Sequence, residues 1–226
     1  MATLYEDALV WDSHAGYELV PGMDLAPTFR WRDAGVDFLS INVGYDVKPW
    51  TQTVAAIAYA RRWVEDHPDT LRLIDSAGQL EATRAAGQLA VAFDIEGMAS
   101  LNSDLSMVSL YRDLGVRQML IAYNLNNDGG GGCHDEDVGL SDFGHAVITE
   151  MNRVGMVVDC SHSAYRSTMD AMETSTKPCV FSHSNSRALQ DHERNILDEQ
   201  MVACATTGGV VGLTGIGLFL SDSGPA

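Results

Sequence analysis

Seven short apolar runs, separated by polar or helix-forming stretches, limit what this chain of 226 residues can fold into. The runs are rich in β-branched residues and do not alternate polar with apolar side chains, as "GMVVDCSH" and "PCVFSHS" illustrate. Runs of this kind predict parallel strands that are buried on both faces. Strands are expected at residues 8–14, 37–45, 89–97, 117–124, 155–162, 178–184 and 208–215.

Amphipathic segments lie between many of these strands. Helices are expected at residues 53–67, 76–87, 141–155 and 197–209, and Ser76 is a candidate N-cap for the second of them. In the third helix an apolar stripe at helical spacing is expected to face the core; it comprises Phe143, Val147, Met151 and Val154. The alternation of strand and helix favours an α/β fold, specifically a (β/α)8 TIM-type barrel.

The length of the chain sets the domain organisation. A complete barrel needs eight strands and typically about 250 residues, so the chain is about one strand–helix unit short. Either one strand has escaped recognition or the sequence is truncated before the last strand. We expect residues 1–226 to form a single barrel domain from which one or more C-terminal strand–helix units are missing.

Side chains able to bind a metal follow the ends of several strands. His14, Glu96, His162 and His183 each end an apolar run. Because the carboxyl ends of parallel strands meet at one face, these side chains are expected to converge. Imidazoles together with a carboxylate are typical ligands of zinc or a similar divalent ion. The structural alternatives are hydrogen-bonded histidines and a salt-bridged acid.

Other polar residues are interpreted as support for this site or as ordinary structure. Asp94 and Asp159 are expected to orient neighbouring side chains as hydrogen-bond acceptors. Three of the four cysteines lie in apolar runs and are expected to be buried, reduced thiols; Cys133, beside His134, has metal binding as an alternative. The glycine run at 129–132 lacks the lysine of a phosphate loop, so it is either an active-site loop or a plain surface loop.

The charge balance excludes some partners. With 14 basic and 31 acidic residues, the formal net charge is −17, which argues against nucleic acid or an anionic membrane surface as a partner. The N-terminal segment carries acids and no basic region, unlike a signal peptide. The longest apolar stretch, "GGVVGLTGIGLFL", is too short and too rich in glycine to span a bilayer. We therefore expect a soluble, cytoplasmic protein without a membrane segment.

The longest motifs of the chain match a known family. The stretch "GLSDFGHAVITEMNRVGMVVDCSH", followed by "PCVFSHSN", "RNILDEQ" and "GGVVG", closely resembles the membrane dipeptidase (renal dipeptidase) family, peptidase family M19. Together with "FDIEG", the resemblance covers most of the chain. It implies an amidohydrolase-like (β/α)8 barrel that hydrolyses dipeptides at a binuclear zinc site. Some members of the family also act on β-lactams, and members often form homodimers.

The resemblance also implies roles for particular residues. Glu96 is similar to the carboxylate that bridges the two zinc ions, and His162 and His183 are similar to the imidazole ligands of the second ion. His14 matches the histidine of the family's opening His-x-Asp motif, which binds the first ion. Arg194, in "HERN", resembles the arginine that holds the substrate carboxylate, for which a guanidinium fork is suited. A surface salt bridge with Glu193 or Asp198 is the structural alternative for this arginine.

Three positions depart from the family pattern. Gly16 stands where the family has the acid of the His-x-Asp motif, and the nearby acids Asp12 and Glu18 have a different spacing. Tyr123, with Asn124 beside it, stands where the family has a histidine that contacts the substrate; a tyrosine can donate a hydrogen bond to a developing oxyanion. The family's aspartate at the end of the eighth strand has no counterpart within residues 1–226.

We therefore expect a zinc-dependent dipeptidase that hydrolyses a small dipeptide with a metal-activated water. The residues expected to hold one or two Zn²⁺ ions are His14, Glu96, His162 and His183. Those expected to contact the substrate are Arg194, Asn124 and Tyr123, the last also as a catalytic group. Two alternatives stay open: a metal-binding scaffold of the same fold that has lost part of the chemistry, and an amide or lactam hydrolase with a different substrate.

Overall fold

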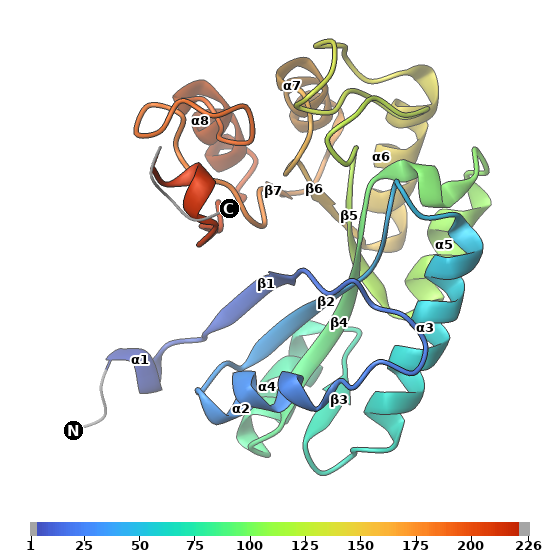
Figure 1. Ribbon diagram of the computed structural model, residues 1–226, viewed down its shortest axis with the longest axis vertical. Helices are drawn as coiled ribbons and strands as arrows, with labels where there is room; N and C mark the ends of the chain where they lie inside the picture. The colour runs from blue at the N-terminus through green and yellow to red at the C-terminus, as the bar shows by residue number, and fades with distance from the viewer. Residues whose placement is uncertain (1–3, 222–226) are drawn as a thin grey trace.

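The computed structural model describes residues 4–221 and contains a parallel β-sheet curled into a half-barrel, with helices on its outer face (Figure 1). The named strands pair in the order β1-β2-β4-β5-β6-β7, and β3 pairs with the beginning of β4. Every pairing between these strands is parallel, so the α/β barrel class expected from the sequence is confirmed in this part of the chain. The strands are β1 Trp11–Ala15, β2 Phe38–Tyr45, β3 Leu71–Leu73, β4 Leu89–Glu96, β5 Val116–Leu120, β6 Val157–Asp159 and β7 Cys179–Val180.

Helices cover the outer face of the sheet. The α-helices are α1 Leu4–Asp7, α2 Phe29–Asp33, α3 Trp50–Glu65, α4 Ala77–Ala85, α5 Ser106–Leu114, α6 Asp142–Val154, α7 Tyr165–Thr174 and α8 Asp198–Thr206. Between residues 4 and 221 there are also three short 3-10 helices, η1 Ala26–Thr28, η2 Met98–Leu101 and η3 Gly217–Phe219. Helix α3 packs against β2 and β3, while α5 and α6 pack against each other and against β5 and β6 (Figure 1). Within residues 4–221, no helix combines the length and the apolar character needed to cross a membrane.

The predicted apolar stripe of α6 is confirmed: Val147 and Met151 are fully buried, and the other two members pack against the core. Six of the seven expected strands also form. The seventh, at residues 208–215, contributes a single parallel bridge between Val211 and Phe181. Strand β3 was not expected, because its three residues include the exposed Arg72. Ser76 occupies the N-cap position of α4, but its side chain makes no capping hydrogen bond.

The curl of the sheet brings its first strand to its last. Strand β1 pairs with β2 along one edge, and the hydroxyl of Ser13 donates a hydrogen bond to the backbone oxygen of Ser182, 2.8 Å away, just after β7. The end of β1 therefore lies beside the end of β7 although the two strands are not paired. This arrangement gathers the carboxyl ends of β1, β4, β6 and β7 around one point.

Candidate metal centre

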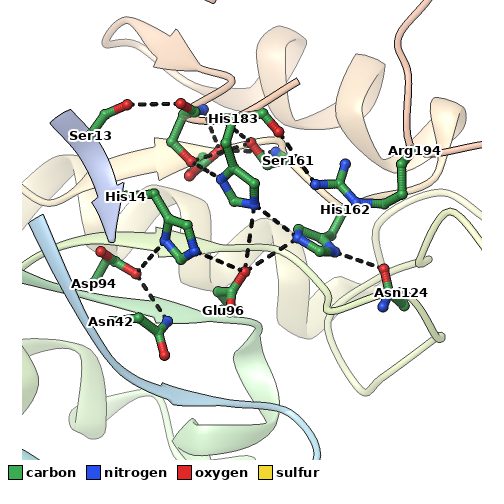
Figure 2. A network of polar contacts seen from close by, with 12 residues as sticks. Ser13, His14, Asn42, Asp94, Glu96, Asn124, Ser161, His162, His183 and Arg194 are labelled. Carbon is green, nitrogen blue, oxygen red and sulfur yellow. Dashed lines mark hydrogen bonds and ion pairs between the residues drawn. The ribbon is translucent and has the colours of Figure 1, made fainter. Parts of the chain in front are cut away.

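Four side chains of types that can bind a metal meet at the carboxyl ends of the strands. His14 lies in β1, Glu96 is the last residue of β4, and His162 and His183 follow β6 and β7; Figure 2 shows their side chains turned toward one another. The Nε2 atoms of the three histidines lie 3.5, 3.3 and 3.6 Å from Oε1 of Glu96, in chain order. Ligand atoms around a tetrahedral zinc, with bonds of about 2.0–2.2 Å, are separated by about 3.3–3.6 Å. The distance from Glu96 to each imidazole therefore fits two ligands that share a divalent ion.

The histidines are not equivalent within this cluster. The ligand atoms of His14, Glu96 and His183 all lie within 4.8 Å of one another, which makes these residues a candidate three-ligand site. The imidazoles of His14 and His183 are stacked, with centroids 4.1 Å apart. His162 adjoins this group, with its Nε2 only 2.8 Å from Nε2 of His183. The family resemblance groups His162 with His183 at the second ion and places His14 at the first, whereas in the structure all three imidazoles lie around Glu96.

The second ring nitrogen of each histidine has a polar partner. Metal-binding histidines usually use this nitrogen for a hydrogen bond that orients the ring. For His14, His162 and His183 the partners are, in order, Asp94 Oδ1 at 3.0 Å, Asn124 Oδ1 at 2.7 Å and Ser182 Oγ at 2.7 Å. All three Nε2 atoms are thereby left facing Glu96 (Figure 2).

Two buried aspartates hold the residues of the cluster and their neighbours in place through hydrogen bonds. Besides His14, Asp94 accepts hydrogen bonds from the side chains of Ser40, at 2.6 Å, and Asn42, at 3.0 Å. Asp159 accepts from Gln118 Nε2 and from the backbone N–H groups of Ser161 and Ser182, which flank the two later histidines. Sequence reasoning missed Asn42, because it lies inside an otherwise apolar strand. The serines beside the two later histidines were visible in the sequence, but the role of Ser182 as a hydrogen-bond partner of His183 was not.

Burial and neighbouring charges set the protonation of the site. Burial lowers the pKa of His14, but the charges of Asp94, Glu96 and Asp159 outweigh it and raise that pKa to about 9. Burial raises the pKa of Glu96 to about 7, even though the charge of His14 opposes the shift. Burial, together with nearby positive charges, lowers the pKa of His162 and His183 well below the usual value. These last two histidines are therefore neutral, which is the form that binds metal.

Comparison with known proteins places the chain in a family. The sequence profile of the membrane dipeptidases (peptidase family M19) matches residues 25–226. The chain belongs to the membrane dipeptidase family. Two uncharacterized dipeptidases of Schizosaccharomyces pombe are 36% and 29% identical to it over 167 and 204 residues. The matches cover 70% and 89% of this chain but 40% and 47% of those proteins, so it spans about half the length of the curated relatives it matches.

A solved structure has the same fold as this member of the membrane dipeptidase family. An amidohydrolase from Pseudomonas aeruginosa superimposes with a TM-score of 0.88 and is 26% identical in sequence. The match covers 96% of this chain and 65% of the amidohydrolase. The fold and the family expected from the sequence are thus both confirmed.

Gly16 is the clearest departure from the membrane dipeptidase pattern. A Cβ atom added at Gly16 would lie 3.4 Å from Nε2 of His14, so this position faces the ligand edge of the ring. Asp12 does not replace the missing acid, because its carboxylate accepts hydrogen bonds from the Trp31 indole, at 2.6 Å, and from the backbone of His14. Glu18 does not replace it either, since its side chain is 75% exposed and is directed to Lys48.

Tyr123 and Asn124 line a cavity of about 870 Å³ that is also lined by His14, Glu96, His162 and His183. The ring of Tyr123 stacks on that of His162, with centroids 4.6 Å apart. Burial raises the pKa of Tyr123, so its hydroxyl remains protonated at neutral pH.

Arg194 lines the same cavity and is 3% exposed. Its Nη2 donates to the backbone oxygen of His183, 3.3 Å away, and its guanidinium lies over the Phe219 ring at 5.3 Å. Its Nε has no partner, and no carboxylate of residues 4–221 lies within 4 Å of it in an ion pair. The alternative of a surface salt bridge is therefore wrong for the described residues; Glu193 pairs with His134 instead.

Asp46 joins the loops that follow β4 and β5. Its carboxylate accepts hydrogen bonds from the backbone N–H groups of Ala99 and Tyr123, each at 2.9 Å, and from Asn127 Nδ2 at 2.8 Å. Gly97, which follows Glu96, has a φ of 109°, and a Cβ atom there would overlap the carboxylate of Asp46. The position of Glu96 thus depends on a glycine next to it in the sequence.

The glycine run at 129–132 is buried, so the interpretation as a plain surface loop is wrong. Cys133, which follows the run, directs its thiol to Oδ1 of Asn124 at 3.7 Å. Burial raises the pKa of Cys133 to about 11, and this residue is outside the candidate metal group. The other three cysteines are buried free thiols, as expected.

Proposed function

We propose that this chain carries the metal centre of a zinc-dependent dipeptidase. The observation that carries the proposal is the convergence of three imidazole Nε2 atoms on one oxygen of Glu96. Three protein ligands are enough to hold a catalytic zinc and leave a position for water. We assign His14, Glu96 and His183 to that role, with His162 as a further imidazole donor beside them. When bound, the ion would activate a water molecule and polarise the scissile carbonyl.

Arg194 is the proposed binding group for the free carboxylate of the dipeptide. A buried guanidinium without a counter-charge is costly, and a substrate carboxylate would offset that cost with two parallel hydrogen bonds. Tyr123 is proposed to donate a hydrogen bond to the oxyanion that develops at the carbonyl. Asn124 lines the cavity next to both the metal-binding cluster and this tyrosine.

Metal content and hydrolysis, measured on the same sample, test the proposal. We expect about one zinc per chain by elemental mass spectrometry, and cleavage of dipeptides that a chelator abolishes. A folded sample without bound metal would reject the proposed function. Bound metal without cleavage of any dipeptide would instead favour a non-catalytic scaffold, and cleavage of other amides or lactams only would favour a different substrate.

Gly16→Asp is expected to raise the metal content from about one to about two ions per chain. The new carboxylate would start from a Cβ position 3.4 Å from Nε2 of His14 and would add an anionic oxygen beside Glu96. The backbone at Gly16 is not left-handed, so a side chain causes no strain there. The measurement is elemental mass spectrometry, with Gly78→Asp as a control because nothing lies within 4 Å of a Cβ atom there. An unchanged metal content in Gly16→Asp would contradict the prediction.

Metal affinity is expected to rise with pH up to about pH 9. At pH 7 His14, with a pKa of about 9, is protonated, and Glu96, with a pKa of about 7, is partly protonated. Metal binding must displace these protons, so each released proton strengthens binding by about tenfold per pH unit. Titration calorimetry in buffers of different ionisation enthalpy counts the protons, and the count should fall as the pH approaches 9. A heat of binding that is independent of the buffer at pH 7 would contradict this expectation.

A further inference from the structure

Asn124 and His162 share a backbone conformation that most residues avoid. Their φ angles are 65° and 62°, in the left-handed region, which among residues with side chains favours asparagine, aspartate and histidine. Such conformations persist only when the surrounding structure holds them in place. Here the two residues are 38 positions apart in sequence, yet their side chains are in contact.

The segment that follows the glycine run binds the backbone of both residues. The backbone N–H of Cys133 donates to the carbonyl oxygen of His162, and that of His134 donates to the carbonyl oxygen of Asn124, both at 2.8 Å. The close approach depends on glycine, since a Cβ atom at Gly132 would lie 2.2 Å from the carbonyl carbon of Asn124. The buried glycine run therefore holds Asn124 and His162 in register with each other.

The side chain of Asn124 determines which ring nitrogen of His162 carries the proton. Its Oδ1 lies 2.7 Å from Nδ1 of His162 and also receives the weaker thiol contact of Cys133. An amide oxygen accepts hydrogen bonds and cannot donate them, so Nδ1 of a neutral His162 must carry the proton. The hydroxyl of Ser182 sets no such requirement on His183, because a hydroxyl either donates or accepts.

We propose that Asn124 is a positioning residue that keeps the proton of His162 on Nδ1 and its Nε2 lone pair directed at Glu96. The lone pair is then available to a divalent ion without a change of tautomer. The consequence for metal binding rests on the proposed function, whereas the position of the proton in the metal-free protein does not.

The tautomer is tested on metal-free protein by long-range ¹H–¹⁵N spectra of the histidine rings. The unchanged chain is expected to show the Nδ1-protonated form of His162. Asn124→Gly keeps the left-handed backbone but removes the acceptor, so the Nδ1-protonated form of His162 is expected to be lost. Asn124→Asp keeps an acceptor, so this form is expected to remain. Asn102→Gly is the matched control, because Asn102 is an exposed left-handed asparagine with a φ of 52°. A proton on Nε2 of His162 in the unchanged chain would overturn the proposal, whether or not the variants fold.

Cobalt(II) binding to the same four proteins tests the consequence. Loss of a group that orients a ligand typically weakens metal binding by about 10- to 100-fold, so we expect that loss in Asn124→Gly only. The visible spectrum of bound cobalt should also change in that variant, because one imidazole is no longer held in place. Equal affinities and spectra in Asn124→Gly and the unchanged chain would overturn the link to metal binding. Absence of cobalt binding in all four proteins would reject the proposed function and leave the tautomer result to stand alone.

Discussion

Replacing Glu96 with glutamine is expected to remove the bound metal and to lower dipeptide hydrolysis by at least about a thousandfold, because metal activation supplies several kcal/mol. Oε1 of Glu96 faces all three imidazoles, at 3.3–3.6 Å. Glutamine has the same shape but lacks the negative charge that a divalent ion requires. Metal content and the rate of hydrolysis are the measurements.

The stability of the metal-free protein separates a loss of metal from a loss of fold. Burial raises the pKa of Glu96 to about 7 in the folded protein. The ionised carboxylate is therefore less favourable in the folded state than in the unfolded state. At pH 7 and above, Glu96→Gln should therefore melt at the same or a higher temperature than the unchanged chain without metal. The exposed Glu65, at the end of α3, provides the control Glu65→Gln, which should keep the metal and the activity. Retention of stoichiometric zinc by Glu96→Gln would refute the site.

Replacing Arg194 with methionine is expected to lower kcat/KM for dipeptides by roughly a hundredfold or more while metal content stays unchanged. Removing one partner of a buried, hydrogen-bonded charge pair costs about 2–5 kcal/mol. Methionine has an apolar chain of similar length and can keep the contact with Phe219. Because Arg194 is buried without an ion-pair partner among the described residues, its replacement should not destabilise the metal-free fold.

A dipeptide amide distinguishes carboxylate binding from other roles of Arg194. The amide lacks the negative charge, so the unchanged chain and Arg194→Met should hydrolyse it at similar rates. For ordinary dipeptides, kcat/KM of Arg194→Lys should lie between that of the unchanged chain and that of Arg194→Met. Lysine keeps the positive charge but lacks the planar guanidinium fork. An equal loss for the dipeptide and for its amide would mean that Arg194 acts on the reaction and does not select the carboxylate.

The residues that the sequence identified well are those that end strands. His14, Glu96, His162 and His183 stand out because continuous apolar runs define the strands, and parallel strands place their carboxyl ends together. The position of these residues at the ends of apolar runs was sufficient to predict that their side chains lie close together. The short strand β3 and the single bridge at Val211 were harder, since two or three residues do not establish a period.

The supporting contacts could not be predicted, because nothing local in the sequence announces them. The contact between Asn124 and His162 depends on two left-handed residues, and asparagine or histidine occurs far more often in other conformations. The glycine run has the composition of an exposed loop, and its burial follows only from the close approach of Asn124 at Gly132. Asp94 was recognised as a supporting acid, but its partner Asn42 comes from a different strand.

The hydrogen bonds of Asp46 determine which parts of the cavity wall are able to move. One carboxylate holds the loop after β4 to the loop after β5, and the glycine beside Glu96 leaves no room between them. Glu96 and Tyr123 are therefore held on two loops that one carboxylate ties together. We expect adjustment to ligands of different size on the side of the cavity where Arg194 lies over the Phe219 ring, and little change around Glu96.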